Sequence, residues 1–196
     1  METIIFATKN QGKLKEIRAI MEGAKWHVIS MEEAGIDIDI EEDGESFIDN
    51  AIIKAQAIAR MTGKIALADD SGLEVDAMDK APGVQSARFM GYDTDYRIKN
   101  QAILDRLSGL GDSERTARFV CAIAAAIPNG ETLTCQATIE GIIGYQIVGE
   151  HGFGYDPIFY LPQYGMTTAE LSPTVKNEIS HRGKALRQMK GMLEGR

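Results

Sequence analysis

The stretch IALADDSGLEVDAM (residues 65–78) decides the fold, because it sets an acidic pair directly after a buried strand. Its first four residues form a short apolar run, which predicts a β-strand over 65–68. Asp69 and Asp70 follow at once, at the carboxyl end of a strand, where open α/β sheets place ligand sites. Taken alone, the pair has two interpretations: ordinary turn residues, or carboxylates that hold a cation such as a metal ion.

The segments before this stretch alternate between strand and helix patterns. Runs rich in β-branched residues predict buried strands, and apolar residues at helical spacing predict helices. Ser46, followed three residues later by Asp49, resembles a capping box and marks the start of one helix. The predicted elements are a strand over 3–8, a helix over 12–23, a strand over 25–30 and a helix over 46–63.

The segments after it add a helix, a hairpin and a final helix. Residues 118–144 predict two strands joined at Asn129-Gly130, a dipeptide typical of hairpin turns. The amphipathic segment 178–195 predicts the last helix. This order predicts an α/β fold with a mixed sheet, parallel early and with at least one antiparallel hairpin late. The middle helix starts at Thr94 and Asp95 and is expected to turn four residues inward: Ile98, Ala102, Ile103 and Leu107.

Composition and charge restrict the class of function. At 196 residues the chain can bury one sizeable core, so a single domain over 1–196 is expected. Its formal net charge of -8 makes it a poor candidate for nucleic-acid binding, which relies on basic surface. No apolar run approaches a membrane span and the N-terminus lacks a signal-peptide pattern, so we expect a cytoplasmic protein without a membrane partner. Cys121 and Cys135 lie in apolar, strand-like segments, which predicts buried free thiols.

The stretch ATKNQGKLKE (7–16) lies between the first predicted strand and the helix that follows it. Lys9, Lys13, the Asn10 amide and the N–H groups of the helix start could together hold a phosphate. The same residues also suit a solvated loop, and both interpretations stay open at this point. The stretch is not a P-loop, because the pattern G-x-x-x-x-G-K-[ST] is not met.

Acidic residues crowd a further stretch, DIEEDGESF (39–47), just before the helix that begins near Ser46. The helix dipole stabilises acids at a helix start, which is a sufficient structural reason for them. The adjacent carboxylates of Asp69 and Asp70 repel each other unless a cation lies near them. Magnesium takes one or two carboxylates together with phosphate oxygens, so it would satisfy the acidic pair.

Two late stretches could contact a nucleobase. In HGFGYDPIFYLP (151–162), glycines flank Phe153, whose ring could stack on a base or fold back into the core. In KNEISHRGKALRQ (176–188), a basic cluster occurs on a protein of net negative charge. A lone histidine there would be an ordinary surface residue, whereas a cluster also suits contact with an anion or a base. The cluster includes Lys176, His181 and Arg182.

These stretches together resemble one family. ATKNQGKLKE, ADDSGLEVDA, APGVQSARF, GFGYDPIF and ISHRGKAL occur in the order and approximate spacing of the inosine/xanthosine triphosphate pyrophosphatases, from residue 4 to about 190. The resemblance implies Mg2+-dependent hydrolysis of non-standard purine nucleoside triphosphates (ITP, dITP and XTP) to the monophosphate and pyrophosphate. It also implies an elongated two-lobed fold around a long mixed sheet, an active-site groove between the lobes, and a homodimer.

The resemblance implies roles for individual residues as well. Asp70 would bind the metal and accept a proton, with Asp69 as its catalytic partner. Glu41 would be the second metal ligand, and the neighbouring Glu42 stays open as an alternative. The residues implied in binding the triphosphate and the base are Thr8, Lys9, Asn10, Gln11, Gly12, Lys13, Lys54, Ser71, Phe153, Gly154, Tyr155, Asp156, Lys176, His181 and Arg182.

Two other functions remain open from the sequence. A pyrophosphatase for modified pyrimidine nucleotides would have a related architecture. A nucleotide-sensing or RNA-binding module without catalysis would share the binding residues, although the net acidity argues against RNA. A panel of nucleotides separates these, because each hypothesis predicts a different pattern of turnover and binding.

Overall fold

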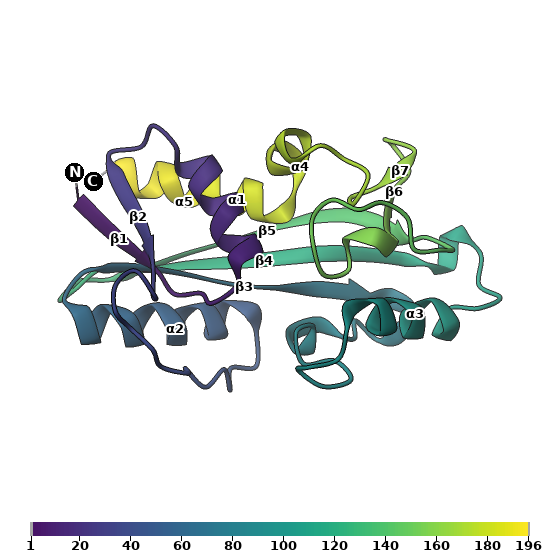
Figure 1. The fold of residues 1–196 in the computed structure, drawn as a ribbon, viewed down its shortest axis with the longest axis horizontal. Helices are drawn as coiled ribbons and strands as arrows, with labels where there is room; N and C mark the ends of the chain where they lie inside the picture. Colours follow the sequence, from purple (N-terminus) through teal and green to yellow (C-terminus); the bar gives the residue numbers. More distant parts are fainter. Residues whose placement is uncertain (1, 196) are drawn as a thin grey trace. The chain divides into compact units, whose positions relative to one another are not determined.

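Seven strands form one mixed β-sheet in the computed structural model, which describes residues 2–195 (Figure 1). Their order across the sheet is β2-β1-β3-β4-β5-β6-β7. β1 pairs in parallel with β2 and β3, whereas β6 pairs antiparallel with β5 and β7, which confirms the predicted mixed α/β class. The strands are β1 (Glu2–Phe6), β2 (Trp26–Ser30), β3 (Ile65–Val75), β4 (Thr116–Ala126), β5 (Thr132–Ile143), β6 (Phe159–Leu161) and β7 (Met166–Thr167).

Polar side chains cap the start of four α-helices within residues 2–195, at Asn10, Ser46, Asp95 and Ser172. The Ser46 hydroxyl accepts a hydrogen bond from the backbone N–H of Asp49 at 3.2 Å, which confirms the predicted start of α2. Asn129, at φ 56, forms the turn between β4 and β5, so the predicted hairpin is confirmed too. The helices are α1 (Gln11–Met21), α2 (Phe47–Thr62), α3 (Tyr96–Arg106), α4 (Pro173–Ile179) and α5 (His181–Glu194).

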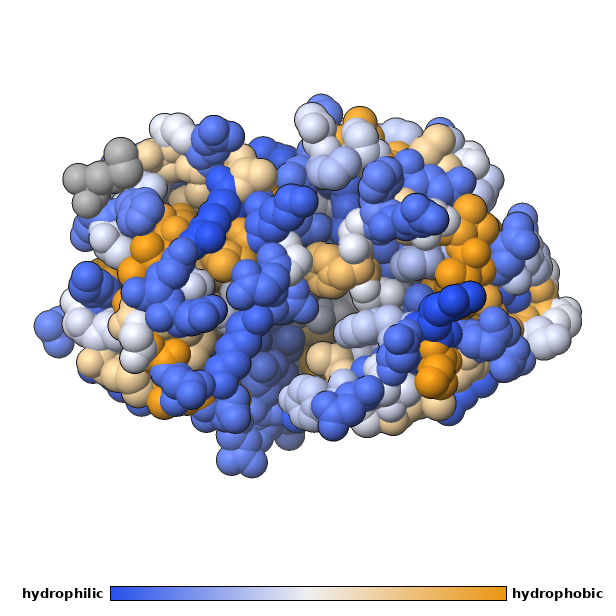
Figure 2. Space-filling model, in the orientation of Figure 1, coloured by the Kyte–Doolittle hydropathy of each residue, from blue (hydrophilic) through white to orange (hydrophobic). Residues whose placement is uncertain are grey.

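The chain divides into two compact units, each with a core of its own. The first unit comprises the chain up to Asp70, Cys121–Ala137, and the chain from His181 onward. The second comprises Ser71–Val120 and Thr138–Ser180. Apolar side chains of β1, α1 and α5 contribute to the first core. Those of α3, β6, the first half of β4 and the second half of β5 contribute to the second. On the face drawn in Figure 2, hydrophilic residues predominate and apolar residues form scattered patches.

In the first unit, helices cover both faces of the sheet. Figure 1 shows α1 and α5 side by side on one face of β1 and β3, and α2 on the other. Leu14 and Ile17 of α1 pack with Leu186 and Met189 of α5 in one apolar cluster. The part of β3 in this unit therefore lies between two helical layers, and successive side chains face one layer and then the other.

The sequence predicted that a strand ends at the acidic pair, but the strand continues through it. β3 continues through Asp69 and Asp70 to Val75, and the expected end after residue 68 is wrong. A run of polar residues usually signals a turn, because unpaired carboxylates are costly to bury. Here cationic side chains from the flanking helices compensate them, so the strand continues.

Two helical predictions were also wrong in detail. In α3, Ile98 is 54% exposed, while the polar Lys99 and Asn100 are buried. The segment 178–195 is not one helix: α4 ends at Ile179 and α5 begins at His181. Ser180, at ψ 157, is extended backbone between them and interrupts the helical hydrogen bonds.

Cys121 and Cys135 are both buried and free, which confirms the prediction. Burial raises the pKa of the Cys121 thiol well above its usual range, so the thiol is unreactive. Among residues 2–195, none of the helices is both long and apolar enough to cross a membrane.

Candidate functional site

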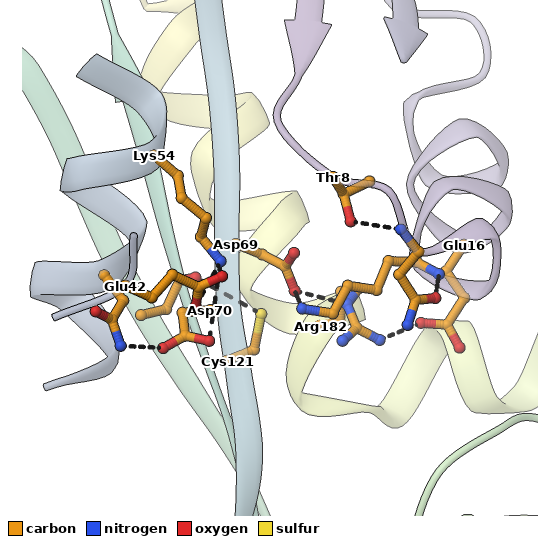
Figure 3. Close-up of polar contacts among 12 residues, drawn as sticks. Thr8, Glu16, Glu42, Lys54, Asp69, Asp70, Cys121 and Arg182 are labelled. Atoms are coloured by element: carbon orange, nitrogen blue, oxygen red, sulfur yellow. Dashed lines mark hydrogen bonds and ion pairs between the residues drawn. The ribbon is translucent and has the colours of Figure 1, made fainter. Parts of the chain in front are cut away.

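Asp69 and Asp70 are neighbours in β3, and their side chains therefore point to opposite faces of the sheet. Figure 3 shows the consequence: the Asp69 carboxylate meets Arg182, whereas the Asp70 carboxylate lies near Lys54 and Glu42. Alternation along the strand separates the two charges without any bound ion. Asp69 and Asp70 therefore belong to two separate groups of side chains.

Asp69 is held by two cations. Its Oδ2 lies 3.0 Å from Lys13 Nζ and 3.2 Å from Arg182 Nε, and its side chain is 1% exposed. Burial alone would raise the pKa of Asp69, but the charges of Lys13 and Arg182 outweigh it and hold the pKa well below the usual aspartate range. Asp69 is therefore a permanent carboxylate that is committed to its two partners.

The second face of Arg182 is paired as well. Its Nη1 donates to a carboxylate oxygen of Glu16, and the guanidinium side chain is only 3% exposed. Lys13 and Glu16 lie one turn apart on α1, so this helix supplies one charge of each sign to the cluster. Two carboxylates, Asp69 and Glu16, thus balance two cations, Lys13 and Arg182. We call these four residues the balanced cluster.

Asp70 has a different set of neighbours, on α2 and the segment before it. Its Oδ2 accepts a hydrogen bond of 2.9 Å from Asn50 Nδ2, and its Oδ1 lies 3.9 Å from Lys54 Nζ. The same ammonium lies 3.3 Å from Glu42 Oε2. Two carboxylates, Asp70 and Glu42, thus share one cation, Lys54. We call these residues, with Asn50, the acidic cluster.

The acidic cluster carries one more negative charge than positive charge. Burial raises the pKa of Asp70 above its usual range, although Lys54 and Lys13 act in the opposite direction. Glu42 raises it further because two like charges lie close together. A raised pKa makes the Asp70 carboxylate a stronger proton acceptor than an ordinary aspartate, and the excess charge favours an added cation.

The acidic cluster has the donor set that suits magnesium. Asp70 and Glu42 both lie within ion-pair distance of one cation, Lys54 Nζ, so two carboxylates from separate segments converge on one place. Magnesium prefers such oxygen ligands, and it typically takes one or two carboxylates with phosphate oxygens and water as the rest. Within residues 2–195, no group of three or more His, Cys, Asp or Glu side chains is arranged to hold a metal by itself. The residues therefore fit a metal that a phosphate ligand completes.

The phosphate-binding candidates of the first unit lie at the start of α1. The Asn10 side chain accepts from the backbone N–H of Lys13 at 3.0 Å, and Thr8 Oγ1 accepts from the N–H of Asn10 at 3.1 Å. These caps fix the loop in front of the helix, whose N-terminus carries partial positive charge. Lys9 instead forms ion pairs with exposed Asp37 and Asp39, at 3.3 and 2.8 Å. Gln11 and Gly12 form the first turn of the helix.

In the second unit, a buried ion pair fixes the loop around Phe153. Asp156 Oδ2 accepts from Lys176 Nζ at 2.6 Å and from the backbone N–H of Phe153 at 2.8 Å. Asp156 Oδ1 accepts from the hydroxyl of Thr168 at 2.8 Å. Lys176 Nζ also lies 5.0 Å from the centre of the half-buried Phe153 ring. A Cβ at Gly152 would approach Asp156 Oδ2 to 2.1 Å, so this close packing requires glycine. These contacts hold the loop that carries the Phe153 ring.

A model of the Ham1 family matches residues 4–192. The chain belongs to the Ham1 family. A dITP/XTP pyrophosphatase of Desulforamulus reducens is 50% identical to it over 190 residues, covering 97% of this chain and 94% of the relative. A dITP/XTP pyrophosphatase of Bacillus subtilis is 44% identical over 194 residues, covering 99% of this chain and 98% of the relative.

Solved structures agree with this assignment. A HAM1 protein from Coxiella burnetii matches this Ham1 chain with a TM-score of 0.90 at 42% identity, over 100% of both chains. The Ham1 protein of Staphylococcus aureus matches with a TM-score of 0.88 at 40% identity, over 99% of both chains. The family and the fold predicted from the sequence are thereby confirmed.

Within each unit, the Ham1 chain brings several of the predicted site residues together. Lys54 and Asp70 lie close to each other, and Phe153, Asp156 and Lys176 form one group. Gly154 and Tyr155 belong to the same loop, at the turn and on its buried side. Ser71, in β3, belongs to the second unit.

Three predicted residues have contacts of their own in the first unit. Arg182, expected at the base, has its guanidinium buried between Asp69 and Glu16. His181 is buried beside it, and both belong to the first unit, whereas the Phe153 loop belongs to the second. At the metal position it is Glu42 that reaches Lys54 and the neighbourhood of Asp70, whereas Glu41 is exposed.

Sequence reasoning missed three residues of this Ham1 site. Asn50 lies one turn before Lys54 on α2, and this spacing alone places both side chains on one helical face. Glu16 stands in the same relation to Lys13 on α1. Thr168 has no such signal, because its distance along the chain from Asp156 predicts no contact.

Proposed function

We propose that this Ham1 chain hydrolyses non-standard purine nucleoside triphosphates, namely dITP, XTP and ITP, to the nucleoside monophosphate and pyrophosphate. The substrate class is supported by the two relatives called dITP/XTP pyrophosphatase, at 50% and 44% identity over nearly the full chain. The structural observation that carries the proposal is the unequal environment of Asp69 and Asp70. A balanced cluster and an acidic cluster on adjacent residues suit a triphosphate with a metal ion.

Cationic groups and backbone N–H groups of the first unit would bind the phosphates. The N-terminus of α1 offers backbone N–H groups to an anion, and Lys13 lies in its first turn. The capped loop from Thr8 to Asn10 is already fixed, so little ordering is needed when a phosphate binds. Lys54 would contact a phosphate oxygen while it remains near Asp70.

Asp70 and Glu42 would hold a magnesium ion. When bound, that ion neutralises phosphate charge and lowers the pKa of coordinated water. Magnesium is proposed because both side chains offer hard oxygen ligands and together exceed the charge of Lys54. Glu41 would then lie outside the metal shell.

Asp70 would accept the proton of the attacking water. The water oxygen forms a bond to the α-phosphorus, and the bond from that phosphorus to the bridging oxygen of pyrophosphate breaks. The proton would pass to an oxygen of the Asp70 carboxylate. Asp69 would not take part in the transfer, because its pKa is held low by Lys13 and Arg182. Its role is to keep Lys13 in place.

The Phe153 loop of the second unit would bind the base. Its ring can stack on a purine, with Lys176 adjacent to one side of the ring. Hypoxanthine and xanthine carry a 6-keto acceptor, whereas adenine presents an amino donor at that position. A donor directed at this oxygen, such as a backbone N–H of the loop, would be left unpaired by adenine. Sites of this type discriminate by about 10⁴-fold or more.

The remaining expectations rest on the family resemblance. We propose a homodimer, a cytoplasmic location and a single bilobed domain. Gel filtration with light scattering would test the dimer, and cell fractionation would test the location. Neither result bears on the chemistry of the site.

The decisive experiment for the function is a nucleotide panel with products identified. Purified protein with Mg2+ should convert dITP, XTP and ITP to monophosphate and pyrophosphate, with GTP and ATP turned over far more slowly. Release of orthophosphate would contradict the proposed bond cleavage. A preference for modified pyrimidine nucleotides, or tight binding without turnover, would identify one of the two alternative functions instead.

A further inference from the structure

Helix α3 buries polar residues where an amphipathic helix would bury apolar ones. Lys99 is 0% exposed and Asn100 is 2% exposed, whereas the neighbouring Ile98 is 54% exposed. Burying a polar side chain is costly unless its hydrogen bonds are made inside the protein. The contacts of these two residues therefore explain why the helix is turned this way.

Both buried residues donate hydrogen bonds to the backbone of other segments. Lys99 Nζ donates to the carbonyl of Ala87 at 2.8 Å. Asn100 Nδ2 donates to the carbonyl of Gly154 at 3.1 Å. All of these residues belong to the second unit. Helix α3 therefore fastens the end of the APGVQSARF stretch and the Phe153 loop to one rigid element.

Aromatic contacts complete the same attachment. The rings of Tyr96, on α3, and Tyr155 meet edge to face with centres 5.2 Å apart. The Tyr155 hydroxyl donates to the carbonyl of Ser86 at 2.7 Å. Helix α3, residues 86–87 and residues 154–155 thus form one closed network.

Gly154 is the point where this network meets the candidate base-binding loop. Its φ of 67 is the left-handed conformation, which glycine adopts at little cost. Its carbonyl belongs to the peptide that joins it to Tyr155, so the direction of this carbonyl sets the turn directly after Phe153. The other side of the turn is held by Asp156, which accepts from the Phe153 N–H at 2.8 Å. Asn100 and Asp156 thus hold the loop from two sides.

The amide of Asn100 is oriented by this single bond. A carbonyl needs a donor, so Nδ2 must face Gly154, and Oδ1 is then directed elsewhere. Oδ1 is buried and accepts no hydrogen bond from residues 2–195. An apolar side chain of the same size would avoid burying this acceptor. The asparagine is therefore explained by what its donor does for the loop.

We propose that Asn100 is a positioning residue for base recognition: by holding the carbonyl of Gly154 it fixes the orientation of the Phe153 ring. This inference rests on the proposed function, since it assigns the Phe153 loop to the base. Asn100 belongs to the second unit, whereas the balanced and acidic clusters belong to the first. Its loss should therefore weaken binding of the base and leave binding of the phosphates unchanged.

The test compares Asn100→Leu with Gln101→Leu. Both variants remove a side-chain amide from α3, but Gln101 is exposed and donates to Asp105 of the same helix, at 2.8 Å. Three quantities are measured: KM and kcat for dITP, inhibition by inorganic pyrophosphate, and hydrogen exchange of the segment 152–156 by mass spectrometry. Asn100→Ala replaces Asn100→Leu if the latter does not fold, because it also removes the donor to Gly154.

We expect Asn100→Leu to raise KM for dITP about 3- to 10-fold, the effect of one hydrogen bond, with kcat changed less than about twofold. The preference for dITP over dATP should fall, exchange over 152–156 should become faster, and inhibition by pyrophosphate should not change. Gln101→Leu should match the wild type in all of these.

Two results would overturn the inference. One is unchanged exchange over 152–156 in Asn100→Leu, and this can be read even if no nucleotide is hydrolysed. The other is an equal loss of affinity for dITP and for pyrophosphate, which would indicate a general structural role. If the wild-type protein fails to hydrolyse dITP, XTP and ITP, that result contradicts only the proposed function. Faster exchange in Asn100→Leu would then still show that Asn100 fixes the loop.

Discussion

The two faces of β3 carry the same side chain at successive positions and surround it differently. On one face, Asp69 faces two cations and its cluster is neutral overall. On the other face, Asp70 shares one ammonium with Glu42, and its cluster keeps one negative charge in excess. One carboxylate has its pKa lowered and the other has its pKa raised, although they are neighbours in the chain.

This difference shows that charge balance decides what a buried carboxylate can do. A fully compensated carboxylate such as Asp69 is stable and chemically inert, because any change of its charge breaks ion pairs. An incompletely compensated carboxylate such as Asp70 has a higher proton affinity and attracts a cation. The substitutions below break one face of β3 at a time, and they are ordered from the largest expected effect to the smallest.

Asp70→Asn should produce the largest loss of activity. The amide keeps the shape of the side chain but can neither accept the proton of water nor bind a metal strongly. We expect kcat/KM for dITP to fall by about 10²–10⁴-fold, the range typical of a general base. Thermal unfolding should remain cooperative at an unchanged or higher midpoint, because a charge in excess has been removed. Activity within threefold of the wild type would contradict the role of Asp70.

Asp69→Asn should act mainly on stability. It removes the carboxylate that Lys13 and Arg182 share, and breaking a buried ion pair costs about 3–5 kcal/mol. Urea unfolding of the metal-free protein measures this. The matched control is Asp37→Asn, which removes an exposed partner of Lys9 and should change the free energy of unfolding by less than about 1 kcal/mol. Equal effects of the two substitutions would show that the balanced cluster is not a stabilising unit.

Glu42→Gln and Glu41→Gln should separate the two acidic neighbours. Glu42 is paired with Lys54 and Glu41 is exposed, so only the first substitution should weaken magnesium binding. We expect about a 10- to 100-fold higher Mg2+ requirement for Glu42→Gln, comparable to other losses at metal sites. A magnesium titration of dITP hydrolysis tests this, and a larger effect of Glu41→Gln would reverse the assignment.

The pH dependence of stability should reveal the low pKa of Asp69. Because the folded protein holds this carboxylate ionised, the stabilisation is present above the usual aspartate pKa of 3.8 and is lost as the pH falls toward the lowered value. The difference in unfolding free energy between the wild type and Asp69→Asn should therefore be constant above about pH 5 and shrink below about pH 4. Urea unfolding at several pH values measures it. A difference that grows toward acid pH would contradict the sign of the shift.

Much of the fold could be predicted because its signals are local. Ser46 and Gly63 bound α2, and Asn129 turns the hairpin, each through a conformation that its residue type favours. The continuation of β3 through Asp69 could not be predicted in this way. It depends on Lys13 and Arg182, which are distant in sequence and become neighbours only when α1 and α5 pack on the sheet.

The site could be predicted in part for the same reason. The family resemblance identified the segments that carry it, but a motif does not tell which way a side chain points. Arg182 was expected at the base, and the motif gave no sign that its guanidinium is buried between two carboxylates. Asn100, which we propose as a positioning residue, belongs to none of these motifs. Its role is inferred from its contact with Gly154.

The division of roles between Asp69 and Asp70 is tested most directly by metal binding without substrate. Mn2+ serves as a paramagnetic probe for the magnesium site, and its binding is measured by electron paramagnetic resonance in the wild type, Asp70→Asn and Asp69→Asn. The measurements are made under conditions in which circular dichroism shows all three folded. We predict that Asp70→Asn weakens Mn2+ binding at least about tenfold, while Asp69→Asn changes it less than about threefold. Loss of binding in Asp69→Asn with retention in Asp70→Asn would contradict the account.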